Sequence, residues 1–276
     1  MWPSVAAVWK TPFTQGFEGS TNYMYTDVEN YVTTGYGNKI DPEPLATQLP
    51  WKRKSTGVLA SPTEVDGEWN TVKNGGNAYR STNAAKVTTL YLDEDAITQL
   101  FNSKTAAFEA SARKIFPNYD NLPADAQLAI MSMLWAEGPG PPGGLSSFTT
   151  LVNAVNKNPP DFATAAAQSH MQGNGIDKRN AADALLFQNA AVVTQKGLDK
   201  SALYWPQSAG DYSPGISDVF GAAQGALTPT NIAVLAAVGL LAYGLHTGKL
   251  RRGLRRAGVY LPTSWRRKIP SLPVPS

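Results

Sequence analysis

Two carboxyl groups and one hydroxyl group near the N-terminus are candidates for acid–base chemistry. Glu18 is followed by Asp27 nine residues later, by Thr33 six residues after that, and then by Gly35 and Gly37. A carboxyl group partly screened from water stays protonated near neutral pH and can donate its proton to a glycosidic oxygen. A better solvated carboxylate stays ionised, and a threonine hydroxyl can help it hold an attacking water. The spacing alone is weak, because most carboxylates in proteins are simply exposed.

The segments around these residues predict a helix end and a small sheet. Residues 23–37 read YMYTDVENYVTTGYG, in which β-forming residues punctuated by glycine indicate a twisted hairpin or a three-stranded sheet. A helix that ends near Glu18 would direct its carboxyl group towards the start of that sheet. Asp27 and Thr33 would then face this group across a cleft.

The pattern E-G-x(7)-D-x(5)-T-x-G-x-G resembles the catalytic signature of the tailed-phage lysozymes, glycoside hydrolase family 24. The similarity continues in the family's order through three further segments, and it covers roughly residues 10–195. These segments are LYLDEDAITQLFNSKTAAFEA at 90–110, MSMLWAEGPG at 131–140 and GNGIDKRNAADALLF at 173–187.

The resemblance implies an α+β, lysozyme-like fold with a small antiparallel sheet lobe, a larger helical lobe and a cleft between them. It implies that Glu18 is the general acid, that Asp27 is the opposing carboxylate and that Thr33 helps to hold the attacking water. The implied reaction is inverting hydrolysis of the β-1,4 bond between N-acetylmuramic acid and N-acetylglucosamine, with no metal or cofactor. Lytic transglycosylases of related fold typically lack the aspartate, so Asp27 argues against that reaction.

Four further residues are candidates for substrate binding. Tyr36 and Trp135 could stack on sugar rings, with core packing as the alternative. Asn38 stands where the family usually has histidine, and the apolar 134–136 segment stands where it often has a polar residue facing the sugar. Arg179 could contact a carboxylate of the glycan or its peptide, or could cap a helix. These departures predict an altered substrate cleft with the chemistry retained.

Residues 1–200 are therefore expected to form the catalytic domain. Within it, residues 51–88 exceed the short connection of the smallest family members, and we expect this insertion to wall one side of the cleft. Ser61-Pro62-Thr63-Glu64 predicts a helix start with a capping box, and Trp69 should lie on the apolar side of that helix. Residues 89–200 show several helical patterns, including a continuously apolar, buried one in LPADAQLAIMSMLWA.

The composition excludes several classes of site. The chain has no cysteine, which rules out disulfides, thiolate metal sites and a cysteine nucleophile, and it has only two histidines, which disfavours a multi-histidine zinc site. The formal net charge of the chain is +3, and the charged residues are unevenly distributed along it. Eight basic and no acidic residues follow position 248, which leaves a net charge of −5 for residues 1–248.

The C-terminal part of the sequence predicts a segment that attaches the protein to a membrane or to the virion. Residues 201–230 are rich in Pro, Gly, Ser and Ala and are typical of a linker, and 232–245 carry no polar side chain. We expect 231–276 to form an apolar helix with a basic tail, and the flanking charges favour membrane contact over a buried or virion-assembly helix. The same charges could bind nucleic acid, but no aromatic interleaving supports this, so no nucleic-acid partner is expected.

No N-terminal signal peptide is evident, so another route to the cell wall is needed. Together with the 231–268 segment, this favours a virion-associated lysozyme that acts on host peptidoglycan during genome delivery. Three alternatives stay open: a wall-binding structural protein of the same fold, a lytic transglycosylase, and an exported bacterial muramidase toxin.

Overall fold

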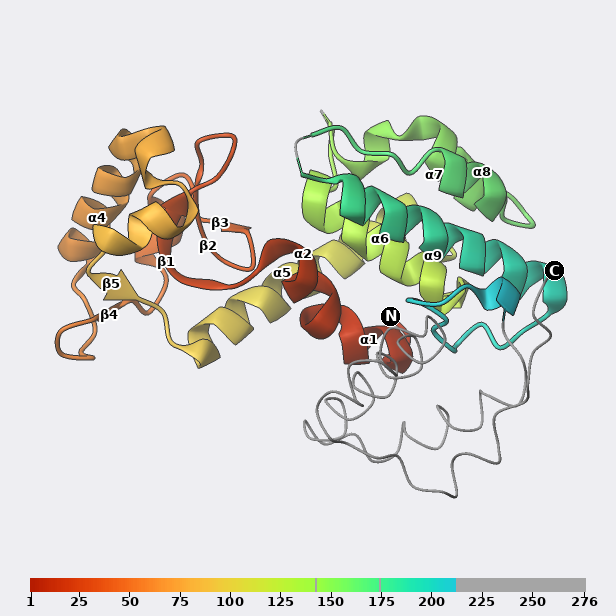
Figure 1. Cartoon of the computed structure of the whole chain (residues 1–276), viewed down its shortest axis with the longest axis horizontal. Coiled ribbons are helices and arrows are strands. Elements are labelled where there is room, and N and C mark those ends of the chain that lie inside the picture. The colour runs from red at the N-terminus through yellow and green to blue at the C-terminus, as the bar shows by residue number, and fades with distance from the viewer. Residues whose placement is uncertain (142, 174, 212–276) are drawn as a thin grey trace, which may run out of the picture. The chain divides into compact units, whose positions relative to one another are not determined.

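The computed structural model describes residues 1–211 except Pro142 and Asn174, and these residues form an α+β fold (Figure 1). Helices predominate, and the strands form a three-stranded antiparallel sheet and a separate two-stranded pair. The predicted α+β class and the small antiparallel sheet are thus confirmed. The predicted apolar helix and basic tail (231–276) and the end of the predicted linker lie outside the described residues. Among the described helices, none is long and apolar enough to cross a membrane.

The three-stranded sheet positions two of the predicted catalytic residues, with Thr33 on a strand and Asp27 in the turn between two strands. Its antiparallel strands lie in the order β1 (Thr21–Thr26), β2 (Val32–Gly35) and β3 (Asn38–Lys39). Tyr25 of β1 pairs with Thr33 of β2 and Thr26 pairs with Val32, so the turn that begins at Asp27 closes the β1–β2 hairpin directly after the second pair.

The 51–88 insertion belongs to the same lobe as this sheet. The helix predicted at Ser61 forms with its capping box intact, and Trp69 is buried and donates to the Ile40 carbonyl at 2.9 Å. This helix packs on β1 and β2, and the turns that follow it pack on β1. The elements of the segment between β3 and the long helix are α3 (Pro44–Thr47), β4 (Lys52–Arg53), α4 (Pro62–Gly75), two 3-10 turns (Gly76–Tyr79 and Ser81–Lys86) and β5 (Leu90–Tyr91).

Five helices follow, as the sequence patterns of residues 89–200 predict. They are α5 (Glu94–Ile115), α6 (Ala124–Glu137), α7 (Thr149–Val155), α8 (Phe162–Ala167) and α9 (Asp177–Lys196). The side chains of α6 are buried from its first residue to Trp135, which agrees with its continuously apolar sequence. Helices α1, α5 and α9 pack around it, whereas α5 also contacts β2 and β3.

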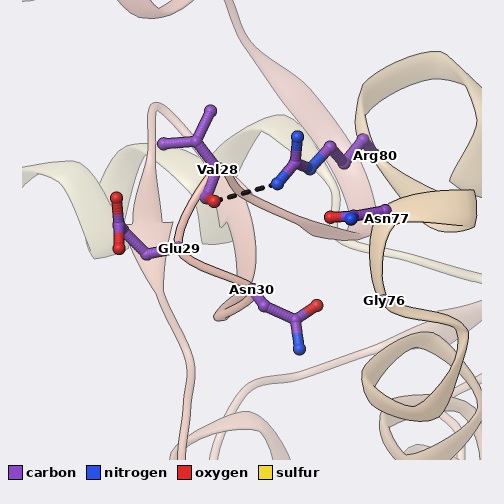
Figure 2. Close-up of a pocket in the computed structure, with 6 residues that line it drawn as sticks. All are labelled: Val28, Glu29, Asn30, Gly76, Asn77 and Arg80. Atoms are coloured by element: carbon purple, nitrogen blue, oxygen red, sulfur yellow. Dashed lines mark hydrogen bonds between the residues drawn. The ribbon is translucent and has the colours of Figure 1, made fainter. Parts of the chain in front are cut away.

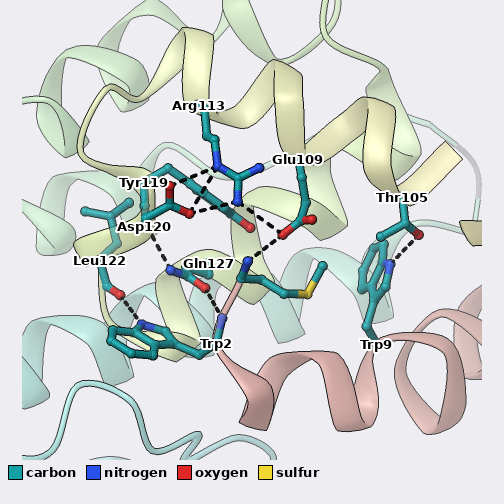
Figure 3. Close-up of polar contacts among 10 residues, drawn as sticks. Trp2, Trp9, Thr105, Glu109, Arg113, Tyr119, Asp120, Leu122 and Gln127 are labelled. Atoms are coloured by element: carbon teal, nitrogen blue, oxygen red, sulfur yellow. Dashed lines mark hydrogen bonds and ion pairs between the residues drawn. The ribbon is translucent and has the colours of Figure 1, made fainter. Parts of the chain in front are cut away.

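The N-terminal segment leads to Glu18 through α1 (Pro3–Val8), a π-helical turn (Trp9–Thr14) and α2 (Gln15–Glu18). Its start is anchored on α5 and α6 (Figure 3). The Met1 amino group binds Glu109 at 2.5 Å, and the Trp2 backbone N–H donates to the Gln127 side chain at 2.7 Å. These contacts fix the segment that carries Glu18 to the helices around α6.

Residues 201–211, which the composition predicts to be the start of a linker, instead belong to the folded body. The buried Asp125 side chain accepts hydrogen bonds from the backbone N–H groups of Tyr204 and Trp205, both at 3.0 Å. The Trp205 ring packs edge-to-face on Phe13 at 5.0 Å. The boundary therefore falls at residue 211 rather than at 200.

We expect a chain that ends at Lys200 to be clearly less stable than one that ends at Asp211. In the shorter chain, the buried Asp125 carboxyl group loses two hydrogen-bond donors, and Phe13 loses the ring that packs on it. Each orphaned buried hydrogen-bonding group costs about 1–3 kcal/mol, so the thermal midpoint should fall by about 10 °C. Circular-dichroism melts of the two chains measure the difference, and equal midpoints would show that the segment contributes nothing.

Candidate active site

Glu18 is the last residue of α2, and its carboxyl group is held on both sides. Arg179 donates from Nη2 to its Oε1 at 2.5 Å. Oε2 lies over Gly37, where a Cβ atom would come within 3.0 Å of it, so the glycine leaves the room that this carboxyl occupies. About a quarter of the side chain (27%) remains exposed. Glu18 is therefore oriented and still accessible to a substrate.

Arg179 lies in the first turn of α9 and is 5% exposed. Its Nη1 donates to the Ser132 carbonyl of α6 at 3.2 Å, and its guanidinium lies 4.9 Å from the centre of the Phe17 ring. The arginine predicted as a substrate contact thus reaches the site, where it faces Glu18. A planar guanidinium group that is held by a carbonyl oxygen and an aromatic ring is well suited to fix a carboxylate in one orientation.

Asp27 and Thr33 lie together at the end of the β1–β2 hairpin. Asp27 Oδ1 accepts from the backbone N–H groups of Glu29 at 3.0 Å and Tyr31 at 2.8 Å. Its Oδ2 accepts from the Thr33 hydroxyl at 3.2 Å. Thr33 is almost fully buried (2% exposed), and Asp27 is half-buried. One oxygen of Asp27 thus orders the turn, and the other binds the Thr33 hydroxyl.

Tyr25 is a further residue of the site that the sequence motif does not single out. Burial raises the pKa of its phenol, and the negative charges of Glu18 and then Asp27 raise this pKa further. Tyr25 therefore lies within electrostatic reach of both groups. The signal that could have found it is strand alternation, because residues two apart on a strand share a face and Tyr25 precedes Asp27 by two.

Lys104 of α5 is a second site residue without a sequence signal. Its Nζ donates to the Gly37 carbonyl at 3.2 Å and lies 4.0 Å from the centre of the Trp135 ring. The pKa of Lys104 is lowered to about 8, because burial lowers it more than the charge of Glu18 raises it, and the charge of Arg179 also lowers it. Two cations from different helices therefore flank the predicted acid.

The remaining predicted binding residues are buried. Tyr36 is 3% exposed and packs edge-to-face on Phe101 at 5.2 Å, and Trp135 is 5% exposed and donates to the Tyr36 carbonyl at 3.0 Å. Asn38 is also buried, and its Oδ1 accepts from the Tyr36 backbone N–H at 3.1 Å. These contacts match the core-packing alternative for both rings and give Asn38 the role of supporting the turn that carries Gly37.

The arrangement can carry out acid–base chemistry on an uncharged bond. It offers an oriented, accessible carboxyl group at Glu18 and a second carboxylate with a hydroxyl at Asp27 and Thr33. Within residues 1–211, apart from the two that are not described, no three His, Asp or Glu side chains gather as metal ligands. A comparison with known protein families finds none that matches the chain, and a comparison with curated proteins finds no match either.

Proposed function

We propose that this chain is a peptidoglycan hydrolase, an N-acetylmuramidase with a lysozyme-like fold, and that Glu18 is its general acid. The observation that supports this best is the pair of carboxyl groups that the fold presents, with Glu18 held by Arg179 at a helix end and Asp27 bound by the Thr33 hydroxyl at a hairpin turn. In the family that the sequence motif resembles, the corresponding two carboxylates act on one substrate. Their local environments also differ, with an arginine at one and backbone N–H groups and a hydroxyl at the other.

In the proposed reaction, Glu18 donates its proton to the glycosidic oxygen, and the bond between this oxygen and the anomeric carbon of N-acetylmuramic acid breaks. A water held by Asp27 Oδ2 and the Thr33 hydroxyl attacks that carbon from the opposite face, and Asp27 takes the water's proton. Glu18 is then a carboxylate, the state that its ion pair with Arg179 stabilises. Arg179 thereby favours proton transfer as well as orienting the acid.

We further propose that the enzyme is virion-associated and acts on the host cell wall, with 231–268 as a membrane or virion contact. The apolar segment 232–245 and the basic residues that follow it in the sequence support this context.

Product analysis tests the hydrolase proposal. The full-length chain would be incubated with purified Gram-negative sacculi, and the released fragments would be separated and weighed by mass spectrometry. We expect reducing N-acetylmuramic acid ends, formed first as the α-anomer because an inverting enzyme reverses the β-configuration. Anhydro-muramic ends would identify a lytic transglycosylase instead. Binding to sacculi without release of fragments would identify a wall-binding protein.

A further inference from the structure

A polar cavity of about 500 Å³ is lined in part by the three residues that follow Asp27 in the sequence (Figure 2). One wall is the β1–β2 turn that Asp27 organises, and the other is the segment that follows α4 in the 51–88 insertion. Six residues line it, namely Val28, Glu29, Asn30, Gly76, Asn77 and Arg80. The insertion thus adds a hollow beside a proposed catalytic carboxylate.

The two walls are tied together by hydrogen bonds. Thr26 donates from Oγ1 to the Gly76 carbonyl at 2.6 Å, and Arg80 donates from Nη2 to the Val28 carbonyl at 2.9 Å. Within the described part of the chain, Asn30 and Ser81 are the non-glycine residues with positive φ, at 61° and 49°. Asn30 lines this cavity and Ser81 directly follows the lining residue Arg80, and backbone held in sparsely populated conformations is concentrated at binding sites. The hollow is therefore a fixed feature of the lobe.

Arg80 gives the cavity its chemical character. It is half-buried, its Nε is buried without a hydrogen-bond partner, and no described carboxylate lies within 4.0 Å of its guanidinium. The Glu29 carboxylate points away from it (Figure 2). The Nη groups of this guanidinium face no carboxylate and retain free N–H donors, so they fit a carboxylate ligand, which can accept two hydrogen bonds in parallel. The amides of Asn30 and Asn77 add neutral donors and acceptors.

We propose that this cavity is a subsite for a carboxylate of the peptide that peptidoglycan carries on its muramic acid, with Arg80 as the binding residue. The inference rests on the proposed function, which places the muramic acid next to Asp27 and so brings its peptide to the adjoining cavity. The lining favours a peptide over a phosphate, because one cation stands among amides, an exposed Val28 (70%) and an acidic residue. A peptide offers amide groups and apolar side chains to match this mixture.

Binding to sacculi tests the subsite without relying on catalysis. Full-length chain carrying Glu18→Gln would be co-sedimented with intact sacculi and with glycan strands stripped of peptide by an amidase. We expect Arg80→Gln to weaken binding to peptide-bearing sacculi about tenfold, the effect of one charge-assisted contact, and to leave binding to stripped strands unchanged. Arg53→Gln is the matched control, because Arg53 lies in the same lobe and pairs with Glu64.

Equal weakening on both substrates, or no weakening on either, would overturn the subsite. Thermal melts check that Arg80→Gln remains folded. If it does not, Asn77→Ala decides, because Asn77 is exposed and its replacement should weaken binding to peptide-bearing sacculi two- to threefold. The hydrolase proposal fails separately, if the wild-type chain releases no fragments while its binding still depends on Arg80 and on the peptide.

Discussion

Replacement of Glu18 by glutamine is expected to lower the rate of peptidoglycan cleavage by about a hundred- to ten-thousand-fold, the usual contribution of a general acid. The amide matches the carboxyl in shape, and its oxygen can still accept from Arg179, but it has no acidic proton to give to the leaving oxygen. Turbidity clearing of chloroform-treated Gram-negative cells by the full-length chain measures the effect.

Glu94→Gln is the matched control for this substitution. Glu94 is an exposed glutamate that pairs with Lys10 at 3.1 Å, so its replacement also removes one ion pair. It should leave clearing unchanged. Glu18→Gln also leaves the buried Arg179 without its counter-charge, so the thermal midpoint must be measured alongside activity. A folded Glu18→Gln chain that clears cells at the wild-type rate would exclude Glu18 as the acid.

The sequence predicted features that rest on short-range signals. The capping box at Ser61 forms because its hydrogen bonds join residues three apart, and the small sheet follows from β-formers separated by tight turns. The contact between Asp27 and Thr33 belongs to the same class, since both residues lie on one hairpin. Helix α6 was recognisable because a helix buried on all sides must be apolar on all sides.

Long-range contacts could not be predicted in the same way. Arg179 binds Glu18 from a distant helix, and Lys104 donates to the nearby Gly37 carbonyl from another. The sequence marked Arg179 only as a possible substrate contact, and it did not mark Lys104. A tryptophan such as Trp135 can either stack on a sugar ring or pack in the core, and the sequence does not distinguish the two. In the structure its ring packs on Phe101 at 4.9 Å, as a core residue does. Residues 201–211 resemble a linker by composition, but Asp125 supplies acceptors for their backbone N–H groups.

The largest effect on stability is expected at a buried carboxyl group close to the site. Asp183 lies one turn after Arg179 on α9, is fully buried, and has no hydrogen-bond partner for either oxygen. Burial raises its pKa to about 8, and the neighbouring Ser132 hydroxyl and Arg179 charge offset this only in part. The folded state therefore binds a proton that the unfolded state releases above roughly pH 4.

It follows that the free energy of unfolding falls as the pH rises from roughly 4 to 8 and levels off above that, because the folded state binds more protons in this range. Between roughly pH 4 and pH 7 this loss amounts to about 4 kcal/mol. Asp183→Asn removes the titration. We therefore expect the variant to gain stability over the wild type as the pH rises through this window, measured by urea unfolding at a series of pH values.

Asp125→Asn provides the contrast that separates this effect from the mere removal of a buried charge. Burial raises the pKa of Asp125 too, but its oxygens accept from Asn189 and from two backbone N–H groups. An amide turns an N–H group towards one of these donors, so this variant should be destabilised by about 1–3 kcal/mol at neutral pH, where Asp183→Asn is stabilised. Parallel pH profiles for wild type and Asp183→Asn would show that Asp183 does not hold its proton in the folded state.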